Sequence, residues 1–303
     1  MPRIVSFLPA GTEIVHALGA GAELVGRSHE CDYPPSVADL PVVSRPALEL
    51  NDASAEDIDR AVTERMETGA SMYEIDEMLL RELRPDVIMT QSLCRVCAPS
   101  GNELSRAVKD FDITPEILFL TPRSVAEVEE NILDVGKAIG RQQEAESLVR
   151  SNRELIARVN AAVSDVPRRR IVFLEWTDPP FCGGHWVPEM VAMAGGDDPL
   201  GRAGEDSVRM TWDDVAEVSP GAIIVSPCGY GLEESTELAR SVPRELNARV
   251  YAVDANAYFA RPGPRIAEGV ELLAHLFHPN RVVWPHAHVP WQEINQDGSA
   301  RLH

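Results

Sequence analysis

The stretch that decides the fold is LRPDVIMT at residues 83–90, where a helix end is followed by a proline and a short apolar run that closes on a hydroxyl. Proline removes a backbone donor and disfavours helix before it, so the helix stops here. A short, continuously apolar run is typical of a strand buried in a parallel sheet. The same order returns as VSPGAIIVS at residues 218–226. Two such copies predict two equivalent α/β lobes.

Outward from these two copies, β-rich runs alternate with helical segments, which indicates parallel sheets with crossover helices. The strands expected in the first half are residues 4–8, 24–26, 87–90 and 117–120, and those in the second half are residues 171–176, 222–226 and 250–253. The helices expected are residues 12–18 with Thr12 as the N-cap, 54–66, 75–83, 187–194, 212–218, 233–241 and 265–276.

Between the two halves, apolar residues recur every three or four positions from Val125 to Val159, which marks one face of a long helical segment. Gly136 and Gly140 should bend or break it. We therefore expect an α/β fold of two Rossmann-like lobes with parallel sheets, joined by a long spanning helical segment. The expected boundaries are an N-terminal lobe at 1–122, a helical spine at 123–166 and a C-terminal lobe at 167–303, whose tail from Asn280 is irregular.

The charge and the first residues limit the partners and the location. The formal net charge is −20, with a pI near 4.8, which argues against nucleic acid as a partner. No apolar run is long enough to cross a membrane. The opening MPRIVSF reads as a strand and lacks the features of a secretory signal. These features predict a cytoplasmic protein, with a periplasmic or extracellular location only if the sequence has been trimmed.

The cysteines follow the predicted strands. In open parallel sheets, ligands bind beyond the carboxyl ends of the strands, and every cysteine is expected in such a loop: Cys31, Cys94, Cys97, Cys182 and Cys228. With His29 and His185 nearby in sequence, these thiols could bind zinc, copper(I) or an iron–sulfur centre. They could equally be small buried residues that fill tight loops.

Aromatic and polar residues share these strand-end loops. The aromatic residues are Trp176, Trp186, Tyr230, Tyr258 and Phe259, and flat rings with a few polar groups fit a large, partly apolar ligand. For each ring, packing in the core is the alternative. Arg261 could pair with a ligand carboxylate or phosphate, or with an acidic residue of the lobe. The amides of the turn at residues 9–13 could hold a polar group. The remaining candidates for ligand binding are Pro9, Thr12, Glu13, His29, Tyr33, Gln91 and His185.

The sequence contains no nucleophile elbow, P-loop, GxGxxG or HExxH motif. We therefore expect a binding protein and not an enzyme. The alternatives are a cytoplasmic metal or iron–sulfur protein for sensing or delivery, and a thiol-dependent enzyme that uses a pair such as Cys182 with His185.

Several motifs resemble the substrate-binding proteins for cobalamin and iron chelates, and the similarity covers nearly the whole chain. They are SFLPAGTE at residues 6–13, VGRS at 25–28, DYP at 32–34 and LRPDVI at 83–88. A branch similar to cobalamin-binding proteins but without a secretion signal is indicated by TQSLCRVC at 90–97, EW at 175–176, PPF at 179–181 and YFARPGPR at 258–265.

The resemblance implies a fold like that of class III periplasmic binding proteins, with a ligand held in a cleft between two lobes. It implies cobalamin, another corrinoid or a metal chelate as the small-molecule ligand, and an ABC-transporter permease as a partner. The cysteine-rich loops depart from the pattern of ordinary cobalamin receptors.

Overall fold

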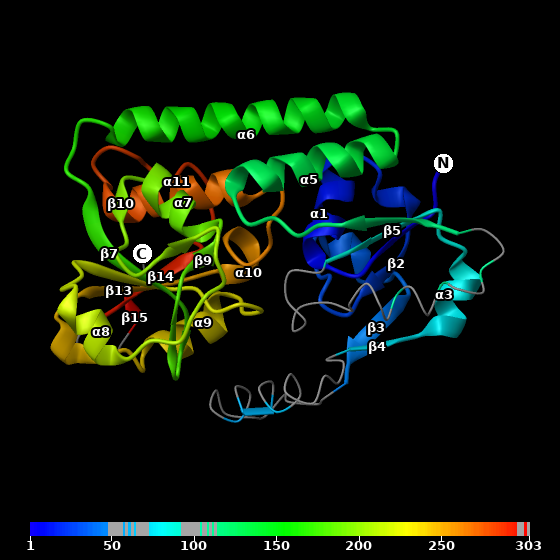
Figure 1. The fold of residues 1–303 in the computed structure, drawn as a ribbon. Helices are drawn as coiled ribbons and strands as arrows, with labels where there is room; N and C mark the ends of the chain where they lie inside the picture. The colour runs from blue at the N-terminus through cyan, green and yellow to red at the C-terminus, as the bar shows by residue number, and fades with distance from the viewer. Residues whose placement is uncertain are drawn as a thin grey trace. The chain divides into compact units, whose positions relative to one another are not determined.

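The computed structural model describes residues 1–47, 57, 60, 61, 64, 73–91, 104, 108, 111, 114–295, 300 and 301. The chain divides into two compact units (Figure 1). Unit 1 comprises residues 1–122 and 126–150, and unit 2 comprises residues 123–125 and 151–303. The predicted helix at 54–66 lies largely outside the described residues.

Unit 1 is built on one six-stranded sheet in the order β4-β3-β2-β1-β5-β6. All neighbours are parallel except the pair β3 and β4. The apolar residues of β1, β3 and β5 pack into one buried cluster, which explains why these short runs form strands. The bounds are β1 (Ile4–Ser6), β2 (Leu24–Ser28), β3 (Val42–Pro46), β4 (Tyr73–Ile75), β5 (Val87–Thr90), β6 (Glu116–Phe119), α1 (Pro9–Ala17) and α3 (Glu77–Leu83), with 3-10 turns η1 (Gly21–Glu23) and η2 (Pro35–Val37).

The first helix starts earlier than predicted. Helix α1 begins at Pro9, and Thr12 lies buried inside it, so Thr12 is not its N-cap. Proline favours the first helical position because its missing N–H would be unpaired there anyway. The hydroxyl of Thr12 instead donates a hydrogen bond to Sγ of Cys31, at 3.1 Å. The turn predicted at residues 9–13 is therefore the first turn of this helix.

The helical segment between the halves is interrupted at Gly140, as predicted, whereas Gly136 lies inside a helix. Helix α5 (Val125–Ala138) ends before Gly140, which has a φ of +70°, and helix α6 (Gln142–Val163) follows. A left-handed residue ends a helix, and glycine adopts that conformation without steric cost. Residues 142–150 of α6 group with unit 1 and residues 151–163 group with unit 2, so one continuous helix contributes to both units.

Unit 2 is built on a second sheet in the order β10-β7-β12-β13-β14-β15, with β8 paired to β7. Strands β10, β7, β12 and β13 are parallel, whereas β8, β14 and β15 pair antiparallel with their neighbours. The bounds are β7 (Arg169–Thr177), β8 (Pro180–Cys182), β9 (Gly184–His185), β10 (Gly196–Asp197), β11 (Arg202–Ala203), β12 (Ala222–Val225), β13 (Arg249–Val253), β14 (Trp291–Ile294) and β15 (Ala300–Arg301). Strands β9 and β11 form a separate parallel pair.

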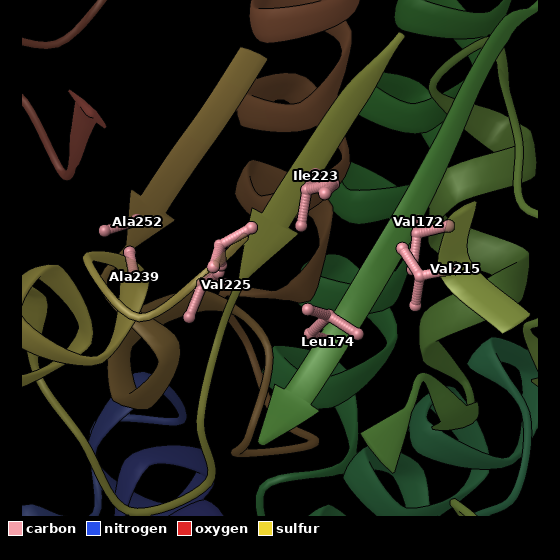
Figure 2. Close-up of a cluster of buried hydrophobic side chains, with 8 residues drawn as sticks. Val172, Leu174, Val215, Ile223, Val225, Ala239 and Ala252 are labelled. Carbon is pink, nitrogen blue, oxygen red and sulfur yellow. The ribbon is translucent and has the colours of Figure 1, made fainter. Parts of the chain in front are cut away.

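The helices of unit 2 are α7 (Val187–Met193), α8 (Trp212–Glu217), α9 (Leu232–Ala239), α10 (Ala255–Tyr258) and α11 (Ile266–Phe277), with one 3-10 turn, η3 (Arg244–Leu246). Figure 2 shows side chains of β7 and β12 packed with residues of α8, α9 and β13. This cluster covers one face of the sheet. The two sheets with crossover helices confirm the predicted α/β class.

The tail is more ordered than predicted. Strand β14 pairs antiparallel with β13, and Trp291 and Glu293 are buried. Arg249 on β13 makes two hydrogen bonds to the carboxylate of Glu293, at 2.8 and 3.0 Å. The alternation of buried positions along WQEI is that of a strand. Among the described residues, no helix is both long and apolar enough to cross a membrane.

Candidate functional site

The carboxyl edge of the unit 2 sheet brings two aromatic side chains together. Strands β7 and β12 run parallel with Leu174 opposite Val225, so the residues after them emerge side by side. The rings of Trp176 and Tyr230 have centroids 5.4 Å apart and are inclined by 58°. Both side chains are half-buried. Tilted ring pairs of this kind combine apolar ring faces with a polar tip, here the hydroxyl of Tyr230.

The loop that carries Tyr230 is held in place by its backbone. Tyr230 N–H donates to the carbonyl of Pro227, and Gly229 between them has a φ of +87°, which glycine tolerates. Asn256 donates from its backbone to the Tyr230 carbonyl and from its side chain to the Gly229 carbonyl. Burial, reinforced by the charge of Glu234, raises the pKa of Tyr230, so its hydroxyl stays neutral.

Next to Trp176 lies a carboxyl group that sequence reasoning missed. Oε1 of Glu175 accepts a hydrogen bond of 2.8 Å from the backbone N–H of Gly184. Burial raises the pKa of Glu175 to about 7, although the bonds from Gly184 and the Ser207 hydroxyl favour its charged form. Only the pair EW pointed to this position in the sequence, and burial of the acid could not be read from it.

His185 has an unusual backbone conformation, and its ring contacts an acid on a neighbouring segment. Its φ is +52°, and its Nε2 lies 3.2 Å from Oδ1 of Asp206. Arg123 lies 3.2 Å from the same carboxylate oxygen. Burial is the largest influence on His185 and lowers its pKa, so the ring is neutral at ordinary pH. The side chain is thus anchored to the β9–β11 region.

Three of the predicted aromatic residues belong to the interior of unit 2. Trp186 donates from Nε1 to the carbonyl of Phe259 at 2.9 Å, and Phe259 packs edge-on against Phe173 at 5.4 Å. The hydroxyl of Tyr258 lies 2.7 Å from Nε2 of His288. Arg261 is also buried. For the three rings, packing in the core is the alternative that the sequence left open.

The predicted residues of unit 1 lie at or near strand ends of its own sheet. Pro9, Thr12 and Glu13 lie in α1, Tyr33 is 46% exposed, and Gln91 directly follows β5. Nδ1 of His29 lies 3.1 Å from the carbonyl of Ser44. The His29 ring also lies 5.7 Å from that of Tyr73, whose hydroxyl donates to Glu30. Tyr73 was not predicted as a site residue, because it comes from the antiparallel edge strand β4, which the sequence did not indicate.

The cysteines occupy dissimilar places. Cys31 is buried in unit 1, and Cys228 is exposed in the loop after β12. Cys182 is the last residue of β8, so the expectation that every cysteine lies in a loop is wrong: the chain turns back after β7 and places Cys182 opposite Leu174. Its Sγ accepts a bond from Val208 N–H, and burial raises its pKa, which disfavours the nucleophilic thiolate. Cys94 and Cys97 lie outside the described residues.

For the described cysteines and histidines, the structure shows the partners of Cys182 and His185. Within the part of the chain that the structure describes, no group of three or more His, Cys, Asp or Glu residues could hold a metal ion. His185 bonds to Asp206, and Cys182 to Val208.

These features define a binding protein of two α/β units, and comparison with known proteins identifies its family. The model of the periplasmic binding protein family matches residues 4–256, so the chain belongs to that family. This is a family of substrate-binding proteins, which confirms the prediction that the chain is not an enzyme.

Individual relatives support the assignment to this family. The uncharacterized ABC transporter substrate-binding lipoprotein YvrC of Bacillus subtilis is 25% identical over 291 residues, which cover 92% of this chain and 80% of the relative. A periplasmic heme-binding protein of Pseudomonas aeruginosa has a TM-score of 0.70 at 16% identity, covering 93% of this chain and 94% of that one. The periplasmic vitamin B12 binding protein BtuF of Vibrio cholerae has a TM-score of 0.61 at 20% identity, covering 91% and 96%. These structural likenesses confirm the predicted fold.

The comparisons also correct the predicted location. The family is one of periplasmic binding proteins and the curated relative is a lipoprotein, so the prediction of a cytoplasmic protein is wrong. That prediction rested on residues 1–7. Residues 4–6 of this stretch form β1, which pairs with β2 and β5. A strand of the folded domain carries no information about export.

Proposed function

We propose that this protein is the substrate-binding component of an ABC transporter and that it binds a corrinoid such as cobalamin, or a related metal chelate. The observation that carries the proposal is the Trp176–Tyr230 ring pair at the carboxyl edge of the unit 2 sheet. Parallel α/β sheets bind ligands at this edge, and a macrocycle presents large flat faces on which aromatic rings pack.

The family and the relatives support this assignment. A periplasmic binding protein needs a binding surface and no reactive group, and burial raises the pKa of the Cys182 thiol, which disfavours its nucleophilic form. Relatives of the same fold are described as binding heme or vitamin B12. The lipoprotein of Bacillus subtilis is described as part of an ABC transporter, which makes a permease the expected partner of this chain.

The proposal is tested by titrating the full chain with cyanocobalamin and following both the quenching of tryptophan fluorescence and the thermal midpoint. A ligand that binds only the folded state must raise that midpoint. The variant Trp176→Leu should weaken binding by about tenfold or more, because it removes one face of the ring pair.

The control is Trp212→Leu. Trp212 is also a tryptophan of unit 2, but it packs on the core cluster from the start of α8. It should lower the midpoint without changing the affinity. If no corrinoid, porphyrin or iron chelate changes fluorescence or midpoint, the proposal fails.

A further inference from the structure

Two hydroxyl groups at the carboxyl edge of the unit 2 sheet are buried without a hydrogen-bond partner. Thr177 is the last residue of β7 and is 1% exposed, and Ser226 follows the last residue of β12 and is 2% exposed. Neither Oγ1 of Thr177 nor Oγ of Ser226 has a partner within the structure. Because β7 and β12 are hydrogen-bonded parallel neighbours, both groups lie at the same edge.

Other buried hydroxyls of the same unit are satisfied. The hydroxyl of Ser235 donates to the Gly231 carbonyl and that of Thr236 donates to the Leu232 carbonyl, each at 2.6 Å. A buried polar group without a partner costs free energy, and native proteins contain few of them. Two together at a ligand-binding edge indicate a partner that is not part of the chain.

Both hydroxyls are close to the ring pair along the chain. Thr177 follows Trp176, and Ser226 precedes the loop that carries Tyr230. Asp178, next to Thr177, is exposed, and so is Cys228, two residues after Ser226. Each buried hydroxyl is therefore followed, within two residues along the chain, by a residue that solvent reaches.

The charges at this edge favour an uncharged ligand group. Glu234 is exposed near this loop and, together with burial, raises the pKa of Tyr230. Among the described residues, Arg265 is a cation close to Asn256, and it donates to the Asn256 carbonyl and lies over the Tyr258 ring. A ligand carboxylate would meet negative charge here. An amide supplies both a donor and an acceptor, which two hydroxyls can satisfy.

We propose that Thr177 and Ser226 form a polar subsite that binds an uncharged amide of the ligand, so that the protein prefers an amide-bearing corrinoid to a carboxylate-bearing porphyrin. This inference rests on the proposed function and specifies its substrate class. The rings contact the macrocycle of the ligand, and the two hydroxyls form hydrogen bonds with an amide at its periphery.

The experiment compares the affinities of the full chain for cyanocobalamin and hemin in the wild type, in Thr177→Val, in Ser226→Ala and in the double variant. We expect cyanocobalamin to bind more tightly than hemin. Each single variant should lose about threefold to tenfold in cyanocobalamin affinity, the effect of one hydrogen bond. The thermal midpoint without ligand should stay equal or rise, because each variant removes an unsatisfied buried group.

The matched controls are Thr236→Val and Ser235→Ala. Each removes a hydroxyl that has a partner, so the midpoint should fall while the affinity stays the same. Tighter binding of hemin, or unchanged cyanocobalamin affinity in the double variant, would overturn the inference and leave the proposed binding of a metal chelate standing. If neither ligand binds and iron chelates also fail, the proposed function fails with it.

Discussion

The backbone N–H of Gly184 donates a hydrogen bond of 2.8 Å to Oε1 of Glu175, which ties strand β9 to strand β7. The carboxyl group lies in a buried setting, and burial raises its pKa from 4.5 to about 7. The folded protein therefore holds a proton on Glu175 at pH values where the unfolded chain has lost it.

This relationship predicts a pH-dependent stability. The contribution of the protonated carboxyl is complete below about pH 4.5 and is lost as the pH rises to about 7, because the folded state binds the extra proton across that window. Asp198, whose pKa burial raises to about 6, acts in the same direction. The free energy of unfolding should fall by at most about 3 kcal/mol from Glu175 across this range, as measured by urea unfolding at about pH 5 and about pH 8.

Glu175→Gln isolates the effect. The amide can still accept the bond from Gly184 but does not titrate, so this variant should lose much of the pH dependence and be more stable than the wild type at about pH 8. Glu217→Gln, at an exposed position of α8, is the control and should leave the profile unchanged. An unaltered profile in Glu175→Gln would mean that Glu175 is already ionised in the folded protein.

The turn between α5 and α6 predicts that substitutions of its two glycines lower the free energy of unfolding by different amounts. Gly140 has a φ of +70°, so Gly140→Ala should destabilise the protein by about 1 kcal/mol through backbone strain. At Gly136 the problem is space, since an added Cβ would overlap with that of Ala145. Gly136→Ala should therefore cost more, about 2 kcal/mol. Lys137→Ala, at an exposed position between them, should change the free energy of unfolding little.

The sequence predicted most strands and helices because each depends on a local signal. The apolar runs at β5, β7 and β12 are buried on both faces of their sheets, so composition alone identified them. Gly140 broke the long helix because its conformation is a property of glycine itself. Elements of this kind can be predicted without knowledge of distant residues.

What the sequence could not predict depends on distant partners. Cys182 lies in a strand because β8 folds back on β7, and the tail forms β14 because β13 offers a free edge. At the candidate site, Trp176 and Tyr230 were named from their place after strands. The unpartnered hydroxyls of Thr177 and Ser226 emerged only from the packing around them.

The pairing of β13 with β14 predicts a difference between two ion pairs. Arg249 and Glu293 make two short hydrogen bonds, and Glu293 is largely buried. Glu293→Ala should destabilise unit 2 by about 1–3 kcal/mol, since a bidentate pair on a buried acid is lost. Arg170 and Asp197 lie 3.4 Å apart and are both exposed.

The exposed pair serves as the comparison. Asp197→Ala should change the free energy of unfolding by less than about 0.5 kcal/mol, because water screens exposed charges. Both values come from urea unfolding, and a double-mutant cycle with Arg249→Met separates the coupling within the first pair from other contacts of Glu293. Equal costs at the two sites would contradict the structural role of β14.

The three described cysteines predict an ordered reactivity that also reports on the ligand. Cys228 is exposed, whereas Cys31 and Cys182 are buried and the pKa of Cys182 is raised by burial. At about pH 8, iodoacetamide should alkylate Cys228 in the folded protein, and should reach the two buried thiols only after unfolding.

Cys228 lies two residues before Tyr230, in the loop proposed to contact the ligand. An excess of cyanocobalamin should therefore slow its alkylation severalfold, as followed by mass spectrometry of the peptides. Modification of the exposed Met78, on α3 of unit 1, by an oxidant serves as the control and should proceed at the same rate with and without ligand. If the ligand raises the thermal midpoint but leaves the Cys228 rate unchanged, the ligand binds away from the loop after β12, because a macrocycle against Tyr230 would restrict access to a thiol so close along the chain.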